Sequence, residues 1–515
     1  MPQILPLGSF NPAAQIVPDL TVAIVDPQTL VPNGAPTDIM GIVGTASFGP
    51  VGHPVVCGDL GEYVSLFGKV QARKHDAGTV VLASVLQGAS DFRIVRVTDG
   101  TDVKASVTLS SGALSAAEVF WGNLASAINA GSGVIRGASQ LVTFDAVTGK
   151  FEALYSGTSG NAVTVAITQG AKANTFRAVV RLGNSQPEVY EGIPAVAGSL
   201  PTLTRYTLAG GTDGADAITS AQLVGVDSEP RTGTYALRGQ GASVVVVADM
   251  DDSTQWTTID AFAATEASYA IQQIAFGTSI ADAVSLKQSV GLDSRYSKLM
   301  HGDGVYLNDT TNGVIRAVSP ASFAAGRISA LSPEQSPLNK SLNGIVGSQK
   351  SGVAGSGATT TYSRADLQQL FSAGIDVICN PQPGGRYWGV RLGHNTSSNP
   401  AVHGDAGTRM NNFLASTFAS VMGFYVGHPI SSVLLDEVAA SLNGTLSILL
   451  SKGLLGSVNP LVIPYRVVCD LSNNPDASTG LGYVRASVQV RTMAINEFFE
   501  IDLEDGPTVT LASQA

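Results

Sequence analysis

The sequence predicts a multidomain protein that combines α/β and α+β domains, and three patterns support this fold class. Between residues 215 and 331, apolar strand-like runs alternate with helix-like segments, as in the βαβ units of a doubly wound sheet. Between residues 101 and 208, short alternating strands predict a β-rich inserted domain. From residue 346 onward, two long amphipathic helices and several strands predict an α+β domain.

The first hundred residues divide into an arm and the beginning of a folded core. Residues 1–20 contain four prolines without helical periodicity and are predicted to form an N-terminal arm. Residues 21–100 are predicted to form the N-terminal part of the core. A helix is expected at residues 60–67, because Gly68 stands just past its end in the usual C-cap place. Strands are expected at residues 21–25, 39–43 and 92–97.

The inserted domain is predicted to span residues 101–208 and to be peripheral. The glycine-rich turn from Gly210 to Gly214 marks its boundary with a middle α/β domain at residues 209–345. One amphipathic helix is expected inside it at residues 116–129. Its strands are expected at residues 103–109, 140–144, 162–167 and 177–180.

The middle domain contains a continuous valine-rich run at residues 242–248, which is typical of a parallel strand buried on both faces. A helix at residues 253–270, a strand at 271–276 and a helix at 282–290 are expected to follow. Residues 332–361 are rich in Ser, Gly and Asn and are predicted to form a loop.

The predicted C-terminal domain, residues 346–515, ends in an alternating segment. Helices are expected at residues 405–422 and 432–452 from their 3.6-residue apolar period. Near the end, Phe499, Ile501 and Leu503 alternate with acidic residues, the pattern of a half-buried strand. A terminal strand can pair with the sheet edge of a neighbouring molecule, so we expect these three residues to belong to a strand donated between subunits.

Composition indicates an assembling protein. Only 13% of the 515 residues are charged, against a usual share of about 25%, which suggests large subunit interfaces. The net charge of −11 argues against nucleic acid as a direct partner. No apolar run reaches the roughly 18 residues of a membrane span, and the first basic residue is Lys69, so neither membrane insertion nor a secretory signal is expected. Three cysteines without C-x-x-C spacing are predicted to be buried, reduced thiols of a cytoplasmically folded chain: Cys57, Cys379 and Cys469.

Acidic residues follow the valine-rich run and raise the question of a catalytic or metal site. Asp249, Asp251 and Asp252 stand where a parallel strand would end, a place where carboxylates can hold Mg²⁺. The same residues can instead begin and cap the next helix. We favour the capping interpretation, because no phosphate loop accompanies them.

The middle domain also resembles a subtilisin-like layer, so a Ser-His-Asp triad with His301 was considered. The sequence has no G-x-S-x-G elbow, and its six histidines never show the i, i+4 spacing of a helical metal pair. We therefore predict no catalytic residue, no metal site and no cofactor, and we expect the protein not to be an enzyme.

Short segments in a consistent order over residues 20–100 and 215–505 carry a family resemblance. They are Phe48-Gly49-Pro50, Leu66-Phe67-Gly68, and residues 90–97, 319–322, 336–340, 374–378, 384–391 and 467–470. Together they resemble the tail sheath protein of contractile bacteriophages and related injection systems. Ser319 and Ala321 depart from the family's P-P-S pattern, and the inserted domain has no counterpart in the resemblance.

The resemblance implies a structural subunit that stacks in rings around an inner tail tube and contracts to drive the tube through the host envelope. Its partners would be other copies of itself, the tube protein, and baseplate and terminator proteins, in a virion tail assembled in the host cytoplasm. The helix at residues 432–452 would face the tube through Asp436, Glu437 and Asn443. The two acids can equally serve only to favour the helix N-terminus.

Two other classes of protein stay open at this point. One is a non-contractile capsid or surface-layer subunit, which the low charge also suits. The other is a hydrolase that uses the middle α/β domain.

Overall fold

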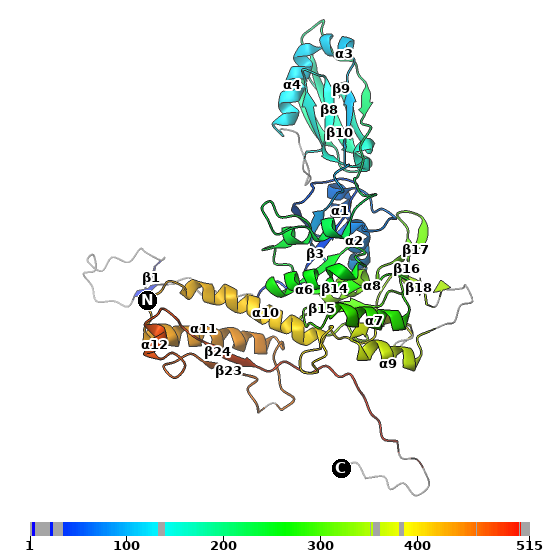
Figure 1. Ribbon diagram of the computed structural model, residues 1–515. Helices are drawn as coiled ribbons and strands as arrows, with labels where there is room; N and C mark the ends of the chain where they lie inside the picture. Colours follow the sequence, from blue (N-terminus) through cyan, green and yellow to red (C-terminus); the bar gives the residue numbers. More distant parts are fainter. Residues whose placement is uncertain are drawn as a thin grey trace, which may run out of the picture. The chain divides into compact units, whose positions relative to one another are not determined.

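The computed structural model describes residues 3–5, 21–23, 34–131, 140–350, 352–353, 361–380, 386–459, 461–503 and 505. The chain divides into two compact units. Figure 1 labels their helices and strands. The larger unit comprises residues 35–416, 454–464 and 491–515, and the smaller one comprises residues 1–34, 417–453 and 465–490.

A seven-stranded sheet in the order β20-β15-β14-β13-β3-β5-β4 forms the centre of the larger unit. Neighbouring strands run parallel, except that β4 is antiparallel to β5. The valine-rich run forms β13, whose four valines are all buried, as predicted for a central parallel strand. The strands are β3 (Ile39–Gly44), β4 (Pro54–Cys57), β5 (Asp91–Arg96), β13 (Val244–Val247), β14 (Tyr269–Gln273), β15 (Ser297–Met300) and β20 (Ile375–Asp376).

The sheet draws on three of the sequence ranges distinguished above: the N-terminal part of the core, the middle domain and the C-terminal domain. Strands β3 to β5 come from residues 21–100, and β13 to β15 come from residues 209–345. Strand β20 lies beyond residue 346, inside the range predicted for the C-terminal domain. The expected boundary at residue 346 therefore does not coincide with an edge of this sheet.

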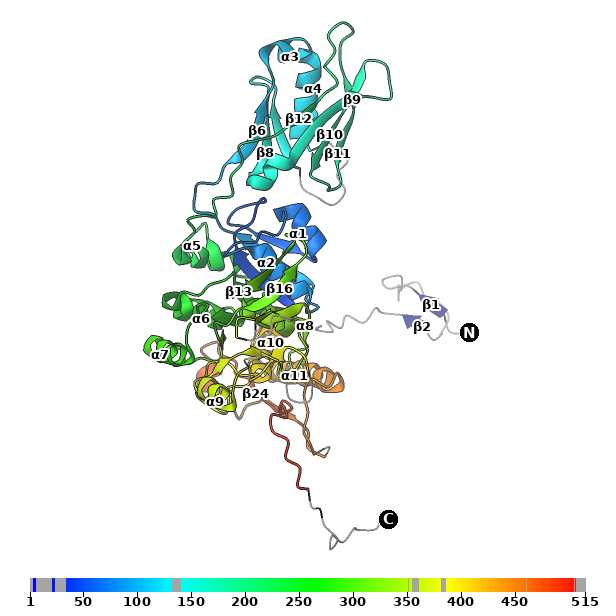
Figure 2. The same cartoon turned by 90° about the vertical axis from the view of Figure 1, so that its right-hand side faces the viewer.

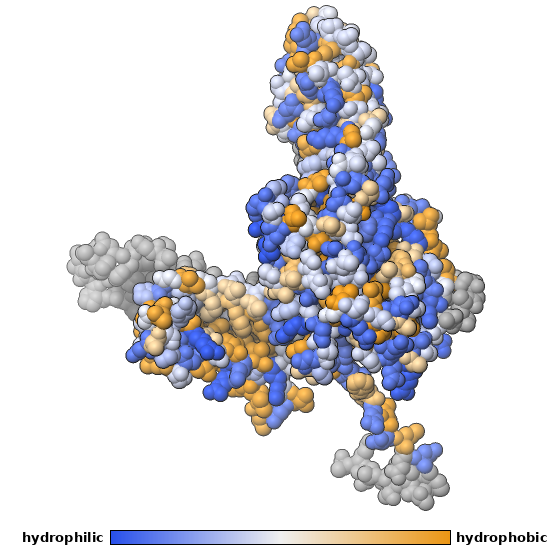
Figure 3. Space-filling model, viewed as in Figure 1, coloured by the Kyte–Doolittle hydropathy of each residue, from blue (hydrophilic) through white to orange (hydrophobic). Residues whose placement is uncertain are grey.

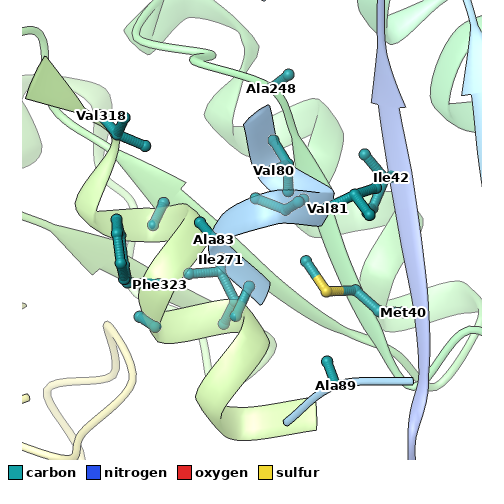
Figure 4. Packing of buried hydrophobic residues seen from close by; sticks show 14 of the residues in the cluster. Met40, Ile42, Val80, Val81, Ala83, Ala89, Ala248, Ile271, Val318 and Phe323 are labelled. Carbon is teal, nitrogen blue, oxygen red and sulfur yellow. The ribbon is translucent and has the colours of Figure 1, made fainter. Parts of the chain in front are cut away.

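Helices cover both faces of the sheet, which agrees with the doubly wound prediction, whereas the subtilisin-like detail stays a prediction. On one face α1 (Leu60–Phe67), α2 (Ala77–Val85) and α8 (Pro320–Ala330) pack against β3 and its neighbours. Figure 4 shows Met40 and Ile42 of β3 in the same cluster as Val81 of α2 and Phe323 of α8. The other face is covered by α5 (Ser220–Val224), η3 (Gly233–Leu237) and α6 (Trp256–Thr265), the last preceded by η4 (Ser253–Gln255).

Helix α1 has the bounds that the sequence predicts. The Asp59 side chain accepts a hydrogen bond from the Glu62 amide at 2.8 Å and caps the N-terminus. Gly68 follows the last turn with φ of 80°, a conformation that favours glycine.

Smaller elements complete this part of the larger unit. Helices α7 (Ile280–Val290) and α9 (Arg364–Ser372) share a hydrophobic cluster with β20. The predicted loop at residues 332–361 contains a strand, β18 (Ile345–Ser348), which pairs with its neighbours in the order β17-β16-β18-β19. The remaining strands are β16 (Val305–Asp309), β17 (Val314–Val318), β19 (Gly352–Val353), β21 (Ile378–Cys379) and β22 (Gly389–Val390).

The β-rich character predicted for residues 101–208 is present (Figure 2). Two sheets, β6-β8-β7 and β11-β10-β9-β12, share one hydrophobic core with helix α4 (Glu118–Asn129). Trp121 of α4 lies at the centre of this core, with ring contacts to Phe120, Phe144 and Phe151. The other elements are α3 (Ser111–Ser115), β6 (Lys104–Thr108), β7 (Val142–Asp145), β8 (Lys150–Ser156), η2 (Thr158–Ala162), β9 (Val163–Gln169), β10 (Thr175–Leu182), β11 (Glu188–Pro194) and β12 (Arg205–Thr207).

The smaller unit is built around α11 (Ser432–Ser451), whose bounds match the prediction within one residue. Leu435, Val438 and Leu442 of α11 pack against Cys469 in its core. Helix α10 (Asp405–Met422), also as predicted, begins in the larger unit and ends in this one. The unit also contains η5 (Gly423–Tyr425), α12 (Asp476–Thr479), the antiparallel pair β23 (Tyr465–Val468) and β24 (Ser487–Val490), and the parallel pair β1 (Gln3–Leu5) and β2 (Thr21–Ala23). The prolines of the predicted arm lie outside the described residues.

The expectation that no segment meets the criterion for a membrane span needs correction. By length and composition, α11 is one helix that does meet it, with a mean hydropathy of 1.4 over an 18-residue window. The core helix of a soluble protein passes the same test, and α11 carries a row of leucine and valine side chains that the core of its unit uses.

Candidate functional site

A buried ionic cluster ties the central sheet to the start of α10. The Nζ atom of Lys298 on β15 lies 2.5 Å from Asp376 of β20 and 2.8 Å from Asp405 of α10. All three side chains are fully buried. The hydroxyl of Tyr269 donates a hydrogen bond to Asp405, and the amides of Leu392 and Gly393 donate to Asp376 at 2.8 and 2.9 Å.

The two carboxylates of the cluster stabilise the charged form of Lys298. Burial alone would lower the pKa of Lys298, but the attraction of Asp376 and Asp405 outweighs it and raises this pKa above its ordinary value. Burial, together with the charge of Asp405, also raises the pKa of Tyr269. The lysine is therefore a fixed cation that holds three elements together rather than a proton donor or acceptor.

Beside this cluster, the loop from Gly393 to Asp405 holds two histidines next to each other. The ring centroids of His394 and His403 are 3.9 Å apart. The Nε2 atom of His394 lies 2.9 Å from Oε1 of Glu497, which belongs to the segment after β24. Burial and the neighbouring imidazole of His394 both lower the pKa of His403. These three residues offer nitrogen and oxygen donors of the kind that hold a metal ion.

Sequence reasoning missed this cluster. The two histidines are nine positions apart, and Glu497 follows far along the chain, so no local motif relates them. Both histidines also line a pocket of about 500 Å³, together with Lys287, Asp293 and Gly374. Its walls come from α7, the end of α9 and the same loop.

The predicted strand-donating residues lie in a segment that is apolar and uncovered. Within the described chain, residues 491–503 belong to no helix or strand. Phe499, Ile501 and Leu503 are 79%, 74% and 87% exposed, and Phe498 is 91% exposed. In Figure 3 orange side chains mark this stretch before the grey terminal atoms. Strand donation by these residues stays a prediction, and within the part of the chain that the structure describes they pair with no strand.

The predicted tube-facing residues of α11 all lie on its exposed side. Asp436, Glu437 and Asn443 are exposed, whereas Leu435, Val438 and Leu442 form the buried row. The side-chain Nδ2 of Asn443 donates to the carbonyl of Ala439 at 2.8 Å. The helix N-terminus is capped by Ser431, whose side chain accepts from the Leu434 amide.

The aspartates after β13 make contacts with neighbouring segments of the chain. Asp249 accepts a hydrogen bond from the His75 amide at 3.1 Å, and Asp251 pairs with Lys74 at 2.9 Å. Asp252 caps η4 by accepting from the Thr254 amide. The capping interpretation made from the sequence is therefore confirmed for Asp252.

His301 does not have the hydrogen bonds of a triad histidine. Its Nδ1 atom accepts from the Gly302 amide at 2.7 Å, so it is not paired with a carboxylate as a triad requires. Its ring lies against Tyr362, whose hydroxyl donates to Asp303. The three cysteines are buried, as predicted, and burial raises the pKa of the Cys57 thiol to about 12.

Comparison with known proteins gives the class to which this fold corresponds. No protein-family model matches the chain, and no curated protein matches it by sequence. Among solved structures, it is similar to the sheath tail protein of Desulfitobacterium hafniense, with a TM-score of 0.54 and 13% identity over 87% of this chain and 93% of that one. A sheath tail protein of Listeria innocua gives a TM-score of 0.55 and 13% identity over 85% and 90%.

The helical sheath of the anti-feeding prophage in its contracted state is also similar, with a TM-score of 0.52 and 11% identity over 95% of this chain and 99% of that one. The chain therefore has the fold of sheath tail proteins, and the resemblance found in its sequence segments is confirmed at the level of the fold.

Proposed function

We propose that this chain is the structural subunit of a contractile tail sheath, which polymerises around an inner tube and contracts to drive the tube through the host envelope. The observation that carries this proposal is the shared fold, which spans almost the whole of this chain and of the sheath proteins. The exposed apolar side chains at residues 498–503 support it, because a polymer can supply the covering that the described part of one chain does not provide.

Donation of the C-terminal segment explains how such a polymer could move without falling apart. Phe499, Ile501 and Leu503 would pack on a neighbour's sheet while the backbone between them adds a strand to its edge. Those hydrogen bonds persist when subunits rotate as rigid bodies. The extended lattice would then be metastable, and contraction would release free energy as subunits pack more tightly.

Partners follow from this role. The chain would contact other copies of itself, the inner tube, and baseplate and terminator proteins, in the tail of a virion assembled in the host cytoplasm. The exposed side of α11, with Asp436, Glu437 and Asn443, is the surface we assign to the tube. Polar contacts suit it, because contraction must break them. This role needs no catalytic group and no cofactor.

Electron microscopy of the purified full chain tests the proposal directly. Negative staining should show hollow tubes with a helical repeat. A chain that stays solitary at every concentration would contradict it, and closed shells would favour the capsid class instead. Replacing Asp436 and Glu437 by Lys should leave tubes intact but abolish their assembly around the inner tube protein. The control variant Asp216→Lys, at another exposed acid, should behave as the wild type.

The hydrolase alternative is the weaker candidate, because the residues considered for it make other contacts. His301 is engaged by the Gly302 amide, and the aspartates after β13 are occupied by Lys74, His75 and Thr254. Labelling of the chain by a fluorophosphonate probe would reopen that alternative.

A further inference from the structure

The His394–His403–Glu497 cluster is a feature that the sheath role does not use. One ligand atom from each residue lies within 4.8 Å of the other two. This spacing brings two imidazole nitrogens and a carboxylate oxygen around a common point. A zinc ion bound by such donors sits roughly 2.0–2.2 Å from each of them, so small side-chain adjustments close the site.

The backbone under the two histidines is held firmly. The Asn395 amide donates to the His403 carbonyl at 2.8 Å, and the Asp405 amide donates to Gly393 at 3.1 Å. The Nζ atom of Lys298 donates to the carbonyl of His394 at 3.0 Å, which fastens the loop to the buried ionic cluster. A ligand set on such a loop is preorganised, so binding costs little conformational entropy.

An ordinary hydrogen bond between histidine and glutamate explains only part of the cluster. It accounts for His394 and Glu497, which are 2.9 Å apart. It leaves the Nδ1 atom of His403 buried without a hydrogen-bond partner, and an unsatisfied buried polar atom destabilises the fold. It also gives no reason for the two imidazole rings to lie with their centroids 3.9 Å apart.

We propose that His394, His403 and Glu497 form a binding site for a divalent transition-metal ion of the zinc class, and that the bound ion fastens the C-terminal segment at Glu497. Two histidines and one glutamate form one of the donor sets of three-ligand zinc sites, where water takes the fourth position. The adjoining pocket of about 500 Å³, which both histidines line, gives the ion a route from solvent.

The position of Glu497 gives the site a mechanical consequence. Glu497 stands two residues before Phe499 and directly precedes the exposed side chains at residues 498–503. A bound ion would hold Glu497 against the Gly393–Asp405 loop and would leave residues 498–503 exposed. The existence of the site is independent of the proposed sheath function, because it needs only the residues of one chain.

Metal binding can be measured on the full chain after removal of metals with a chelator. Titration calorimetry with Zn²⁺ should show one ion per chain, and Co²⁺ should give the visible absorption bands of a low-coordinate site. Glu497→Gln should weaken Zn²⁺ binding by about tenfold or more, because it replaces a charged ligand. The variants His394→Asn and His403→Asn should weaken it further.

Matched controls make this test decisive. Glu500→Gln alters an exposed glutamate three residues away, and His53→Asn alters an exposed histidine elsewhere, so both should bind Zn²⁺ as the wild type does. Glu497 is itself exposed, so its variant should fold normally, which circular dichroism can verify. Zinc affinity that is the same in the wild type and in Glu497→Gln would overturn the proposal.

Proteolysis tests, separately from metal binding, whether the bound ion holds the C-terminal segment at Glu497. Chymotrypsin should cleave at the exposed Phe498 and Phe499 more slowly when Zn²⁺ is present. The Glu497→Gln variant should lose this protection and the Glu500→Gln variant should keep it. Cleavage of the wild type at the same rate with and without Zn²⁺ would overturn the fastening.

Discussion

Strand β13 and the segment around Phe499 both have the apolar pattern of a strand, but only one of them is covered. The four valines of β13 are at most 5% exposed and lie between two parallel neighbours. Phe499, Ile501 and Leu503 are at least 74% exposed, and they pair with no strand among the described residues. A pattern thus predicts what kind of neighbour a segment needs, but not whether its own chain supplies that neighbour. Completion of this part of the fold by another molecule is what our proposal of strand donation predicts for the segment.

The largest expected effect comes from removing the uncovered segment. Deletion of residues 496–515 should leave a folded single chain that no longer forms tubes, because the donated strand is gone. Sedimentation and negative staining measure the loss. A shorter deletion of residues 506–515, which keeps Phe499 to Leu503, is the control and should still assemble. Tubes of normal length from the longer deletion would refute strand donation.

The contribution of the buried central sheet to stability is tested at Lys298 of β15. The Lys298→Met variant leaves Asp376 and Asp405 as unpaired buried charges, so it should lower the free energy of unfolding by about 3–5 kcal/mol. Urea denaturation measures this change. Lys74→Met removes a surface ion pair with Asp251 and should cost less than about 1 kcal/mol. Equal costs for the two variants would show that the buried cluster is not a main support of the fold.

A smaller effect is expected at Glu188 in the inserted domain. Burial raises its pKa to about 7, while the Tyr190 hydroxyl donates to it at 3.1 Å. The folded state therefore holds this proton more tightly than the unfolded state. The Glu188 carboxyl does not affect the free energy of unfolding at a pH below its pKa in the unfolded chain. It lowers this free energy increasingly as the pH rises from about 4.5 to 7.

Glu188→Gln should accordingly make the chain more stable at pH 8, by up to about 2 kcal/mol, and change little at pH 5. Urea unfolding followed by tryptophan fluorescence at both values measures the difference. Glu191→Gln, an exposed neighbour three residues on, is the control and should show no such change. An identical pH dependence in the wild type and in Glu188→Gln would rule out the buried carboxyl as its source.

The smallest effect on assembly is expected from removing the inserted domain. Deletion of residues 103–206 takes away the Ser156 carbonyl, one of three that the fully buried Arg96 binds, but leaves those of Gly49 and Asp213. Stability should fall by roughly 1.5–3 kcal/mol for the lost charged hydrogen bond, while tubes still form. Collapse of the whole fold, seen by circular dichroism, would show that the domain is integral to the sheet.

Much of the fold could be predicted where local chemistry decides it. Helix α1 matches its predicted range because Asp59 and Gly68 fix its ends, and α10 and α11 match because their apolar period is strong. Helix α2 was missed because nearly all of its residues, including Gly78 and Thr79, are buried, which removes any amphipathic period.

Other features depend on contacts between distant residues and had no local signal. Strand β18 lies in a stretch rich in Ser and Gly, and its pairing with β16 and β19 defines it. The histidine and glutamate cluster arises because the Gly393–Asp405 loop and the segment at Glu497 meet in the fold. In contrast, the exposed side of α11 follows directly from its period, so Asp436, Glu437 and Asn443 could be placed correctly on the surface.

The two chain connections between the central sheet and the inserted domain have a practical use. The Val103 amide donates to the Thr212 carbonyl and the Thr212 amide donates back to Val103, both at 3.1 Å. The chain therefore enters and leaves the domain at adjacent points. Any foreign module whose own ends lie close together can be spliced in here, for example a fluorescent reporter or an antigen. If the chain polymerises, such a fusion would display the passenger at regular intervals along a nanotube.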